Sequence, residues 1–473
     1  MTLLTLIISI FETLGIISAI VALVRPRTSQ GAIAWIISLL TIPYIAVPLF
    51  WIFGRTKFHG YVSLRQKGDS QLAHIAQALR EKEEALLEVP PYQQSRLSAL
   101  EKMAKLPYFS GNELEILIDG ERTFDSIFSS FDQAKHYILV QFFIVRDDNI
   151  GREFKARLVA KAKQNIKVYF LYDEIGCRRL DASYWDDLRE AGVHVSSFHS
   201  TRGIWNRFQL NFRNHRKIVI VDGRIAWLGG HNIGDEYMSR SRRFGHWRDT
   251  HIRIEGPAVL GVQFSFVEDW HWATTEKLLE LNWEPRQPRK NGHILLVIPS
   301  GPADEFETAS LMIQQAIQEA NERFWIASAY FVPDEGVMQA LRLAALRGVD
   351  VRILIPDKLD HVLPYLSVYS VAGDMIKAGI KIYRYTDGFL HEKIFLIDDF
   401  AAAVGTANLD NRSFRLNFEI TAIALGDNFA SQIEAMLEKD FARAREMTLR
   451  HIHRKPLWFK LVSRAAYLAA PAQ

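Results

Sequence analysis

The feature that most constrains the fold of this chain is a repeated order of sequence patterns. In the first half, an apolar run, an amphipathic stretch and a second apolar run follow one another at residues 136–145, 151–165 and 166–173. The same order returns in the second half over residues 323–357. Short apolar runs rich in β-branched and aromatic residues, separated by a helical pattern, predict a β-α-β unit. A unit that occurs twice in one chain indicates an internal duplication.

The boundary between the two halves lies in a stretch rich in proline and charge. This stretch, NWEPRQPRKNG, occupies residues 282–292, and its composition is typical of a connection between domains. We therefore expect an α/β protein with two similar halves, at residues 109–285 and 286–450, each a mixed sheet flanked by helices. The length of 473 residues agrees, because a single core of that size is unusual.

Each half also carries a histidine and a lysine two residues apart at the head of an apolar run. The two groups read NHRKIVIVD and HEKIFLID, and they contain His215, Lys217 and Asp222, and His391, Lys393 and Asp398. Alternate residues of a strand point to the same face, so each histidine shares a face with its lysine. Composition alone predicts about 0.03 matches to H-x-K-x₄-D per chain. Two matches therefore indicate function rather than chance.

A lysine beside an imidazole favours the binding of an anion, and phosphate is the obvious candidate. The imidazole can act as a nucleophile or carry a proton. The lysine supplies positive charge where a transferred phosphoryl group gains negative charge. Asn232 and Asn408 follow glycines after each motif, and we expect them to bind substrate by donating hydrogen bonds to its phosphate oxygens. No metal is expected, because the nearby lysines would repel a cation.

Composition excludes other classes of site. The single cysteine, Cys177, permits neither an intrachain disulfide nor a four-cysteine zinc site and suits a reducing compartment. The 57 basic and 54 acidic residues nearly balance, so a dedicated nucleic-acid binder is not expected. The chain contains no G-x-x-x-x-G-K-[ST] loop, so we expect no nucleotide and no other cofactor.

Two apolar stretches precede the duplicated body, at residues 2–24 and 31–53. Each is long enough to span a bilayer as one helix. A cleaved signal peptide is the alternative for the first stretch, but no lysine or arginine precedes Arg25. Glu12 within the first stretch leaves a shallow or re-entrant segment open. We expect residues 1–55 to form a membrane hairpin of two transmembrane or re-entrant helices.

Basic residues around the hairpin predict its orientation. Two lie in the turn and four follow the second stretch: Arg25 and Arg27, then Arg55, Lys57, Arg65 and Lys67. The excess after the second stretch favours a cytoplasmic body. We expect a helical linker over residues 56–108, with a helix at 69–89. The basic tail at residues 451–473 is expected either to lie on an anionic membrane surface or to be solvated.

These motifs resemble those of the phospholipase D superfamily, and within it the bacterial cardiolipin synthases. The resemblance covers essentially the whole chain, including RNHRKIVIVDG, WLGGHNIGDEY, FLHEKIFLID and GTANLDNRSFRLNFEI. It implies a phosphatidyltransferase of phospholipid biosynthesis that passes a phosphatidyl group from one phosphatidylglycerol to another, giving cardiolipin and glycerol. It also implies a multi-pass protein of the bacterial inner membrane, with phospholipids as partners.

The resemblance further implies roles for individual residues. His215 would be the nucleophile that forms a phosphohistidine, and His391 the acid and base. Lys217 and Lys393 would hold the phosphate. Two supporting carboxylates, Asp249 and Glu419, would hold the ring nitrogens that face away from the substrate. For Asp222 and Asp398, which we group with the catalytic residues, a structural role stays open beside a chemical one.

Alternatives to this reading remain open at this point. A phospholipase D would use water as acceptor and release phosphatidic acid, and a related phosphatidyltransferase would use another alcohol. A nuclease shares the motif, but the apolar hairpin and the balanced charge argue against it. A membrane-anchored scaffold with a decayed site would not be expected to keep both motifs intact. The sequence does not predict the oligomeric state.

Overall fold

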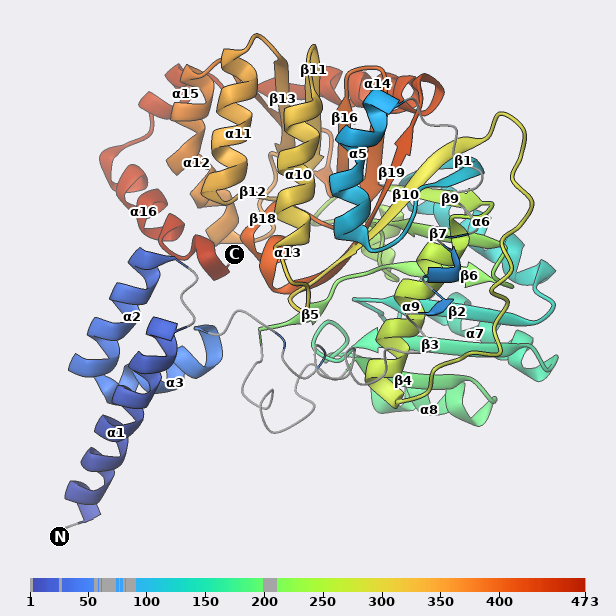
Figure 1. The fold of residues 1–473 in the computed structure, drawn as a ribbon, viewed down its shortest axis with the longest axis horizontal. Coiled ribbons are helices and arrows are strands. Elements are labelled where there is room, and N and C mark those ends of the chain that lie inside the picture. Colours follow the sequence, from blue (N-terminus) through green and yellow to red (C-terminus); the bar gives the residue numbers. More distant parts are fainter. Residues whose placement is uncertain are drawn as a thin grey trace. The chain divides into compact units, whose positions relative to one another are not determined.

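The computed structural model describes residues 3–24, 28–54, 58, 61, 74–75, 77–79, 81, 91–198 and 211–472. The chain divides into two compact units. One unit contains Met1–Ser63 with His199–Phe212, and the other contains Leu64–Phe198 with Arg213–Gln473. Figure 1 shows the elements of both. Each unit is described by itself below.

The first unit contains three apolar helices, α1 (Leu3–Val24), α2 (Ser29–Thr41) and α3 (Pro43–Phe53). Small and apolar side chains of the three helices form one buried cluster, which contains Ala19, Ala22, Leu39, Ala46, Val47 and Phe50. A hydrogen bond of 3.0 Å from Trp51 Nε1 to Ser18 Oγ joins α3 to α1. The N-terminal apolar helices therefore pack against one another.

The second apolar stretch, for which we expect one transmembrane or re-entrant helix, is divided into α2 and α3. Ile42 interrupts it with φ −135° and ψ 57°, and Pro43 starts the next helix. Proline lacks an N–H and disfavours helical geometry in the residue before it. Within the described residues, only Thr5–Val24 forms a helix long and apolar enough to cross a membrane.

Parts of the expected linker and hairpin turn cannot be compared with the structure. The six basic residues that orient the hairpin lie outside the described residues, as does most of the helix expected at 69–89. The described part of the linker contains α5 (Pro91–Ala104), which precedes the first strand of the body.

The second unit contains two halves with the same strand order. In the first half the strands follow one another across the sheet as β1 (Phe109–Ile118), β9 (Thr250–Glu255), β7 (Ile225–Gly229), β6 (Ile218–Val221), β2 (Tyr137–Phe142), β3 (Lys167–Asp173) and β4 (His194–Phe198). In the second half they follow as β10 (His293–Ser300), β19 (Asn417–Leu425), β17 (Ala401–Gly405), β16 (Lys393–Ile397), β11 (Arg323–Ser328), β13 (Asp350–Pro356) and β14 (Lys381–Tyr385), and β20 (Ala444–Glu446) extends the edge. The predicted duplication is confirmed.

The two sheets are joined into one. Strands β1 and β10 pair antiparallel, with Phe109 opposite Leu295, so the sheet continues from one half into the other. Within each half the pairing is mixed: β2, β3 and β4 run parallel, while β2 and β6 run antiparallel. The strands next to the motifs are buried along their whole length, which explains their continuous apolar sequence.

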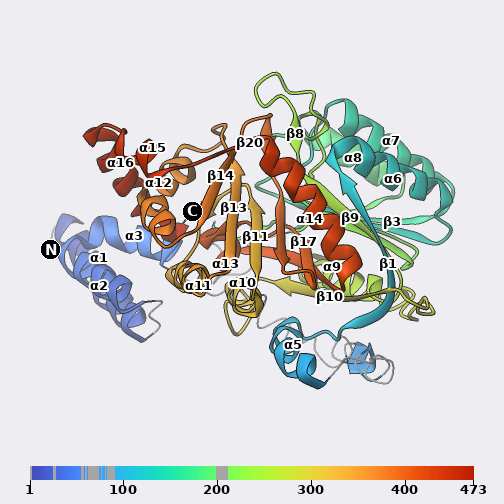
Figure 2. The same cartoon turned by 90° about the horizontal axis from the view of Figure 1, so that it is seen from above.

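Helices flank these strands. The first half uses α6 (Asp119–Gln133), α7 (Asn149–Lys163), α8 (Ala182–Glu190) and α9 (Val259–Thr274). The second half uses α10 (Thr308–Glu319), α11 (Glu335–Leu346), α12 (Val362–Lys377) and α14 (Asp427–Ala442). In Figures 1 and 2, α10 and α11 lie together on one side of the second-half strands and α14 lies on the other.

Apolar residues at helical spacing hold these layers together. Helix α6 buries Phe124, Ile127, Phe128 and Phe131, which recur at intervals of three and four residues and therefore share one face. The three phenylalanine rings pack with Phe154 of α7 at centroid distances of 5.4 to 6.3 Å. This core supports the first-half strands on one face.

Two short strand pairs connect the halves close to the motifs. Strand β5 (Arg213–Asn214) leads into the first motif and pairs with β19 of the second half. Strand β15 (Phe389–Leu390) leads into the second motif and pairs with β8 (Trp247–Arg248) of the first half. Each motif therefore begins against the opposite half of the chain.

Candidate active site

Backbone hydrogen bonds fix both motif histidines to the opposite half. The N–H of His215 donates to Phe418 O at 2.9 Å, and the N–H of His391 donates to Arg248 O at 2.8 Å. Strands β6 and β16 follow directly. The position of each histidine therefore depends on both halves.

A buried carboxylate from the opposite half contacts each imidazole. His215 Nδ1 lies 2.9 Å from Glu419 Oε2, and His391 Nδ1 lies 2.7 Å from Asp249 Oδ2. Both carboxylate side chains are completely buried. An imidazole that donates Nδ1–H to a carboxylate keeps the lone pair of Nε2 for chemistry. The geometry therefore gives two oriented imidazoles with Nε2 turned away from the carboxylates.

Polar neighbours hold both carboxylates in place. Glu419 accepts hydrogen bonds from Thr406 Oγ1 at 2.6 Å and from Asn417 Nδ2 at 3.1 Å. Asp249 accepts one from the N–H of Thr250 at 2.8 Å. A glycine is required beside Asp249, because a Cβ on Gly230 would lie 2.0 Å from Asp249 Oδ1. The lack of a side chain at Gly230 therefore makes room for the Asp249 carboxylate.

Both motif lysines are buried beside the histidines. Lys217 Nζ donates to His215 O, and Lys393 Nζ donates to His391 O and lies 3.0 Å from His391 Nδ1. Burial lowers the pKa of Lys393 to about 8, although Asp249 and Glu419 oppose the shift. Burial also lowers the pKa of Lys217 well below its ordinary value. A bound anion would raise the pKa of both lysines, because an opposite charge favours the protonated form.

The imidazoles are neutral at pH 7 in the free site. Burial lowers the pKa of His215 to about 4, with Lys217 and Lys393 acting in the same direction and Glu419 opposing them. Burial and the two lysines also hold the pKa of His391 well below its usual range. Burial would raise the pKa of Glu419, but His215 and Lys217 outweigh it and hold that pKa below its ordinary value. Because the lysine of each motif lowers the pKa of the histidine of the other motif, the two motifs lie close enough to form one site.

The motif aspartates lie at the far ends of their strands. Asp222 follows β6 and accepts backbone hydrogen bonds from Lys135, His136 and Tyr137 at 2.8 to 2.9 Å. Asp398 follows β16 and accepts equivalent bonds at the start of β11. Both adopt positive φ, 55° and 47°. This geometry favours the structural role that the sequence leaves open for both aspartates, since they close the turn after each motif strand and hold the neighbouring strand.

The two motif asparagines have different surroundings. Asn232 Oδ1 accepts from the N–H of Ile144 at 3.0 Å, and its Nδ2 donates to Tyr237 Oη at 3.1 Å. Asn408 Oδ1 is buried without a hydrogen-bond partner among the described residues. The side-chain amide of Asn232 therefore already has hydrogen bonds to protein groups at both its oxygen and its nitrogen. The amide oxygen of Asn408 has no hydrogen-bond partner among the described residues.

The residue between the histidine and the lysine of each motif also contributes to the site, which the sequence did not predict. Arg216 donates to Glu419 O at 3.0 Å and pairs with Asp269 at 2.8 Å. Glu392 lies 2.8 Å from Arg248, which also pairs with Asp440 at 2.7 Å. A charged residue between the histidine and the lysine, directly before a buried apolar run, was the signal in the sequence for both.

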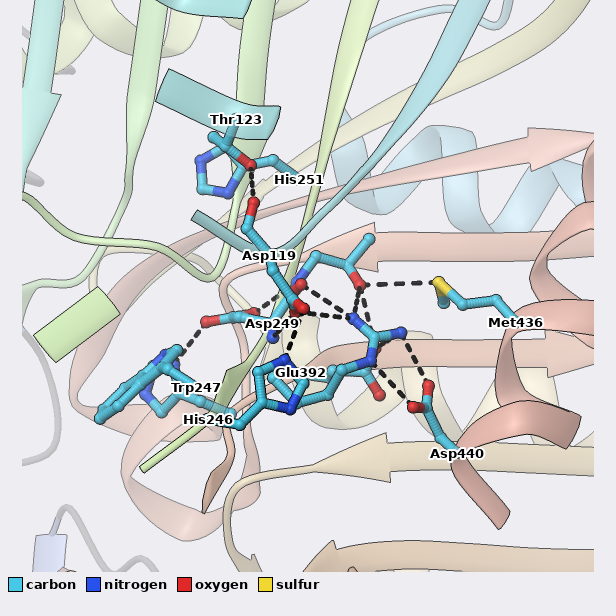
Figure 3. A network of polar contacts seen from close by, with 12 residues as sticks. Asp119, Thr123, His246, Trp247, Asp249, His251, Glu392, Met436 and Asp440 are labelled. Atoms are coloured by element: carbon cyan, nitrogen blue, oxygen red, sulfur yellow. Dashed lines mark hydrogen bonds and ion pairs between the residues drawn. The ribbon is translucent and has the colours of Figure 1, made fainter. Parts of the chain in front are cut away.

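Figure 3 shows the cross-half network around Asp249 and Glu392. Arg248 is almost fully buried. Its guanidinium donates to the carbonyl oxygen of Asp249 and to Thr250 Oγ1. It also forms ion pairs with Glu392 and Asp440. Thr250 Oγ1 also donates to Glu392 at 2.9 Å. Farther out, His246 Nε2 lies 2.7 Å from Asp119 Oδ2. The network braces the carboxylate that orients His391.

No cluster of three or more histidine, cysteine or acidic residues suited to a metal ion occurs within the described part of the chain. The donor set of the site fits an anion instead, because two buried lysines flank the two imidazoles.

Comparison with known proteins identifies the family. The model of the family described as "Cardiolipin synthase, PLD-like domain" matches residues 127–245 and 313–441. Cardiolipin synthase A of Pseudomonas putida strain W619 is 46% identical over 446 residues, which cover 93% of this chain and 92% of that protein. Cardiolipin synthase A of Pseudomonas fluorescens strain Pf-5 is 43% identical and covers 98% of this chain and 97% of that protein.

Among solved structures, the phosphatidylserine synthase of Haemophilus influenzae has a similar fold. The TM-score is 0.61 at 15% identity, with 80% of this chain and 99% of that one covered. Both family-model matches fall on the duplicated body and include one H-x-K-x₄-D motif each. The chain therefore belongs to the cardiolipin synthase family of proteins with a duplicated PLD-like domain.

Proposed function

We propose that this chain makes cardiolipin by moving a phosphatidyl group from one phosphatidylglycerol to the headgroup hydroxyl of a second, with release of glycerol. The observation that carries this proposal is the pair of imidazoles, each held at Nδ1 by a carboxylate of the opposite half and each beside a buried lysine. The membership of the chain in the cardiolipin synthase family supports it.

In the first step, His215 Nε2 attacks the phosphorus of the donor lipid. The new P–N bond replaces the bond from phosphorus to the glycerol headgroup oxygen, and His391 gives that oxygen a proton. Glu419 stabilises the positive charge that His215 gains. Lys217 and Lys393 balance the charge that accumulates on the phosphoryl oxygens.

In the second step, His391 takes the proton of the acceptor hydroxyl as the acceptor oxygen attacks phosphorus. The P–N bond breaks, cardiolipin leaves, and both histidines return to their starting states. Proton donation in the first step requires a charged His391. The pKa of His391 lies well below its usual range in the free site, and the anionic phosphodiester would raise it by offsetting the lysine charges.

We further propose that the reaction takes place at the bacterial inner membrane, with the body on the cytoplasmic side and without a nucleic-acid partner. Helix α1 is long and apolar enough to cross the bilayer, and it supports an anchor for the chain. An anchored body would meet donor and acceptor lipids at high effective concentration.

Product analysis tests the proposed function. Full-length protein in vesicles with phosphatidylglycerol labelled in its headgroup should release labelled glycerol and form cardiolipin. Phosphatidic acid without cardiolipin would instead indicate a hydrolase that uses water as acceptor. Added phosphatidylethanolamine or another alcohol would reveal a different acceptor if its phosphatidyl ester formed in preference to cardiolipin.

A further inference from the structure

The last helix of the chain, α16 (Leu457–Tyr467), presents a row of large apolar side chains to solvent. The exposed fractions are 74% for Leu457, 65% for Trp458, 59% for Leu461, 45% for Val462 and, just after the helix, 83% for Leu468. Positions 457, 461 and 468 recur on one face of a helix. Apolar side chains of this size and exposure are usually covered by a partner.

The opposite face of α16 is already occupied. Ser463 and Ala466 are buried on that face, and the ring of Phe459 meets that of Tyr369 of α12 at a centroid distance of 5.0 Å. The exposed apolar residues therefore do not belong to the contact between α16 and the body. They form a second apolar face that points away from it.

Positive charge is concentrated around this exposed face. Residues 443–473 contain seven lysines and arginines and one acidic residue, whereas the whole chain has a net charge of only +3. Arg464 lies within α16, and Lys460 Nζ donates to His453 O at 3.1 Å at the start of the helix. The remaining basic residues of the segment precede the helix.

An open groove next to α16 adds one cation, Arg384 of β14, to the basic residues of this segment. It has a volume of about 280 Å³, and its lining includes Arg384, Arg445, Arg454 and Lys455, against the acidic Asp357 and Glu446. Arg384 and Arg445 both lie near Asp357 Oδ1, at 3.3 and 3.5 Å. The groove therefore holds more positive than negative charge.

We propose that this C-terminal segment is a second membrane contact, in which α16 lies in the interface of an anionic bilayer. Its apolar face would enter the boundary between headgroups and acyl chains, and the basic residues would lie among the phosphates. Trp458 suits the position of an interfacial anchor. A second copy of this surface fits less well, because it would bring two strongly positive segments together.

This contact is distinct from the reaction site. None of its residues belongs to the two motifs or to their carboxylates, so its test does not depend on the reaction proposed above. Its effect would be to hold the body itself against the lipid surface, in addition to any anchorage by the N-terminal helices.

Depth-dependent quenching tests the proposal with the full-length protein reconstituted in vesicles. A Leu461→Cys variant carries an environment-sensitive fluorophore, and the vesicles contain lipids with a nitroxide on the acyl chain. Cys177 is buried, which limits labelling at that site. A Ser431→Cys variant, labelled at an exposed position of α14, is the matched control.

With vesicles of phosphatidylcholine and phosphatidylserine, the label at position 461 should shift to the blue and lose most of its fluorescence, while the label at 431 should not. Pure phosphatidylcholine, high salt or the double substitution Arg454→Glu and Arg464→Glu should reduce the quenching several-fold.

Three results would overturn the proposal. The first is equal quenching at positions 461 and 431. The second is quenching that responds to neither lipid charge nor charge reversal. The third is a label that is shielded from aqueous iodide but not quenched by lipid, which would mean that another protein segment covers the helix. Energy transfer between labelled copies in that third case would identify a second copy as the cover.

Discussion

His391 and Asp249 form a hydrogen bond between the two halves of the chain, with Nδ1 and Oδ2 2.7 Å apart. The reciprocal pair, His215 and Glu419, has a contact of 2.9 Å. Because each half supplies the histidine of one pair and the carboxylate of the other, neither half contains a complete oriented imidazole. The duplication has therefore produced one shared site rather than two independent ones.

The first prediction concerns the carboxylates. Asp249→Asn and Glu419→Gln should each lower kcat by about 10²- to 10⁴-fold, because the amide cannot stabilise the imidazolium or fix its tautomer. KM should change little, since neither carboxylate touches the substrate in the proposed mechanism. Steady-state kinetics in mixed micelles would measure both constants, with the exposed Asp125→Asn as control. An unchanged kcat in either variant would remove that carboxylate from the mechanism.

The second prediction concerns pH. The pKa of Lys393 is lowered to about 8 and that of His215 to about 4. A lysine loses its charge as pH rises through its pKa, and a nucleophilic histidine becomes protonated as pH falls through its own. We therefore expect kcat/KM to fall above about pH 8, and to show no acidic loss between pH 7 and about pH 5, because His215 stays neutral there while a lower pH favours the charged His391 that the first step requires.

Profiles of kcat/KM and kcat against pH would check this expectation. The alkaline fall in kcat should lie at higher pH than that in kcat/KM, because the bound phosphodiester favours charged lysines. An acidic fall in kcat/KM near pH 6.5 would show that His215 retains an ordinary pKa and would contradict the environment described here.

The third prediction separates structure from chemistry at Asp222. Asp222→Ala should lower the free energy of unfolding by about 1–3 kcal/mol, since three backbone N–H groups lose their acceptor. The kcat per folded molecule should stay unchanged. Asp222→Asn should be milder, because asparagine retains an acceptor and tolerates positive φ. Thermal unfolding and kcat would be measured on the same samples, and a large loss of kcat without destabilisation would restore a chemical role.

The fourth prediction concerns the cross-half network. Arg248→Met should destabilise the protein by about 3–5 kcal/mol, because it leaves Glu392 and Asp440 buried without their cation. Arg248→Lys should not restore stability fully, since lysine lacks the planar fork that contacts several acceptors. Adding Glu392→Gln to Arg248→Met should recover part of the loss. If the effects of Arg248→Met and Glu392→Gln on the free energy of unfolding were strictly additive in the double variant, the two side chains would not interact.

Much of the fold follows from local patterns. The apolar runs at 136–145 and 323–332 predict buried strands, and the repeat predicts two similar halves. The pairing of β5 with β19 and of β15 with β8 could not be predicted, because it joins segments far apart in the chain. The break before Pro43 was visible in the sequence, but a count of apolar residues ignores the missing N–H.

The site was predictable to a similar degree. The spacing of His215 and Lys217 predicts a shared face and an anion site, whereas Arg248 and Asp440 are 192 residues apart and meet only in the fold. For Asp222 the sequence predicts importance but not the role of the side chain. A position within a motif indicates that a residue matters, but only its three backbone contacts indicate that it supports the turn.

In the proposed reaction, His215 becomes covalently attached to the phosphatidyl group. Full-length protein in vesicles with phosphorus-labelled phosphatidylglycerol, stopped rapidly under alkaline denaturing conditions and digested, would reveal this intermediate by mass spectrometry. We expect an alkali-stable, acid-labile label on the peptide that contains His215, absent in His215→Asn and retained in the control His136→Ala. Cardiolipin formation without any protein-bound label, or with the label on another residue, would contradict it.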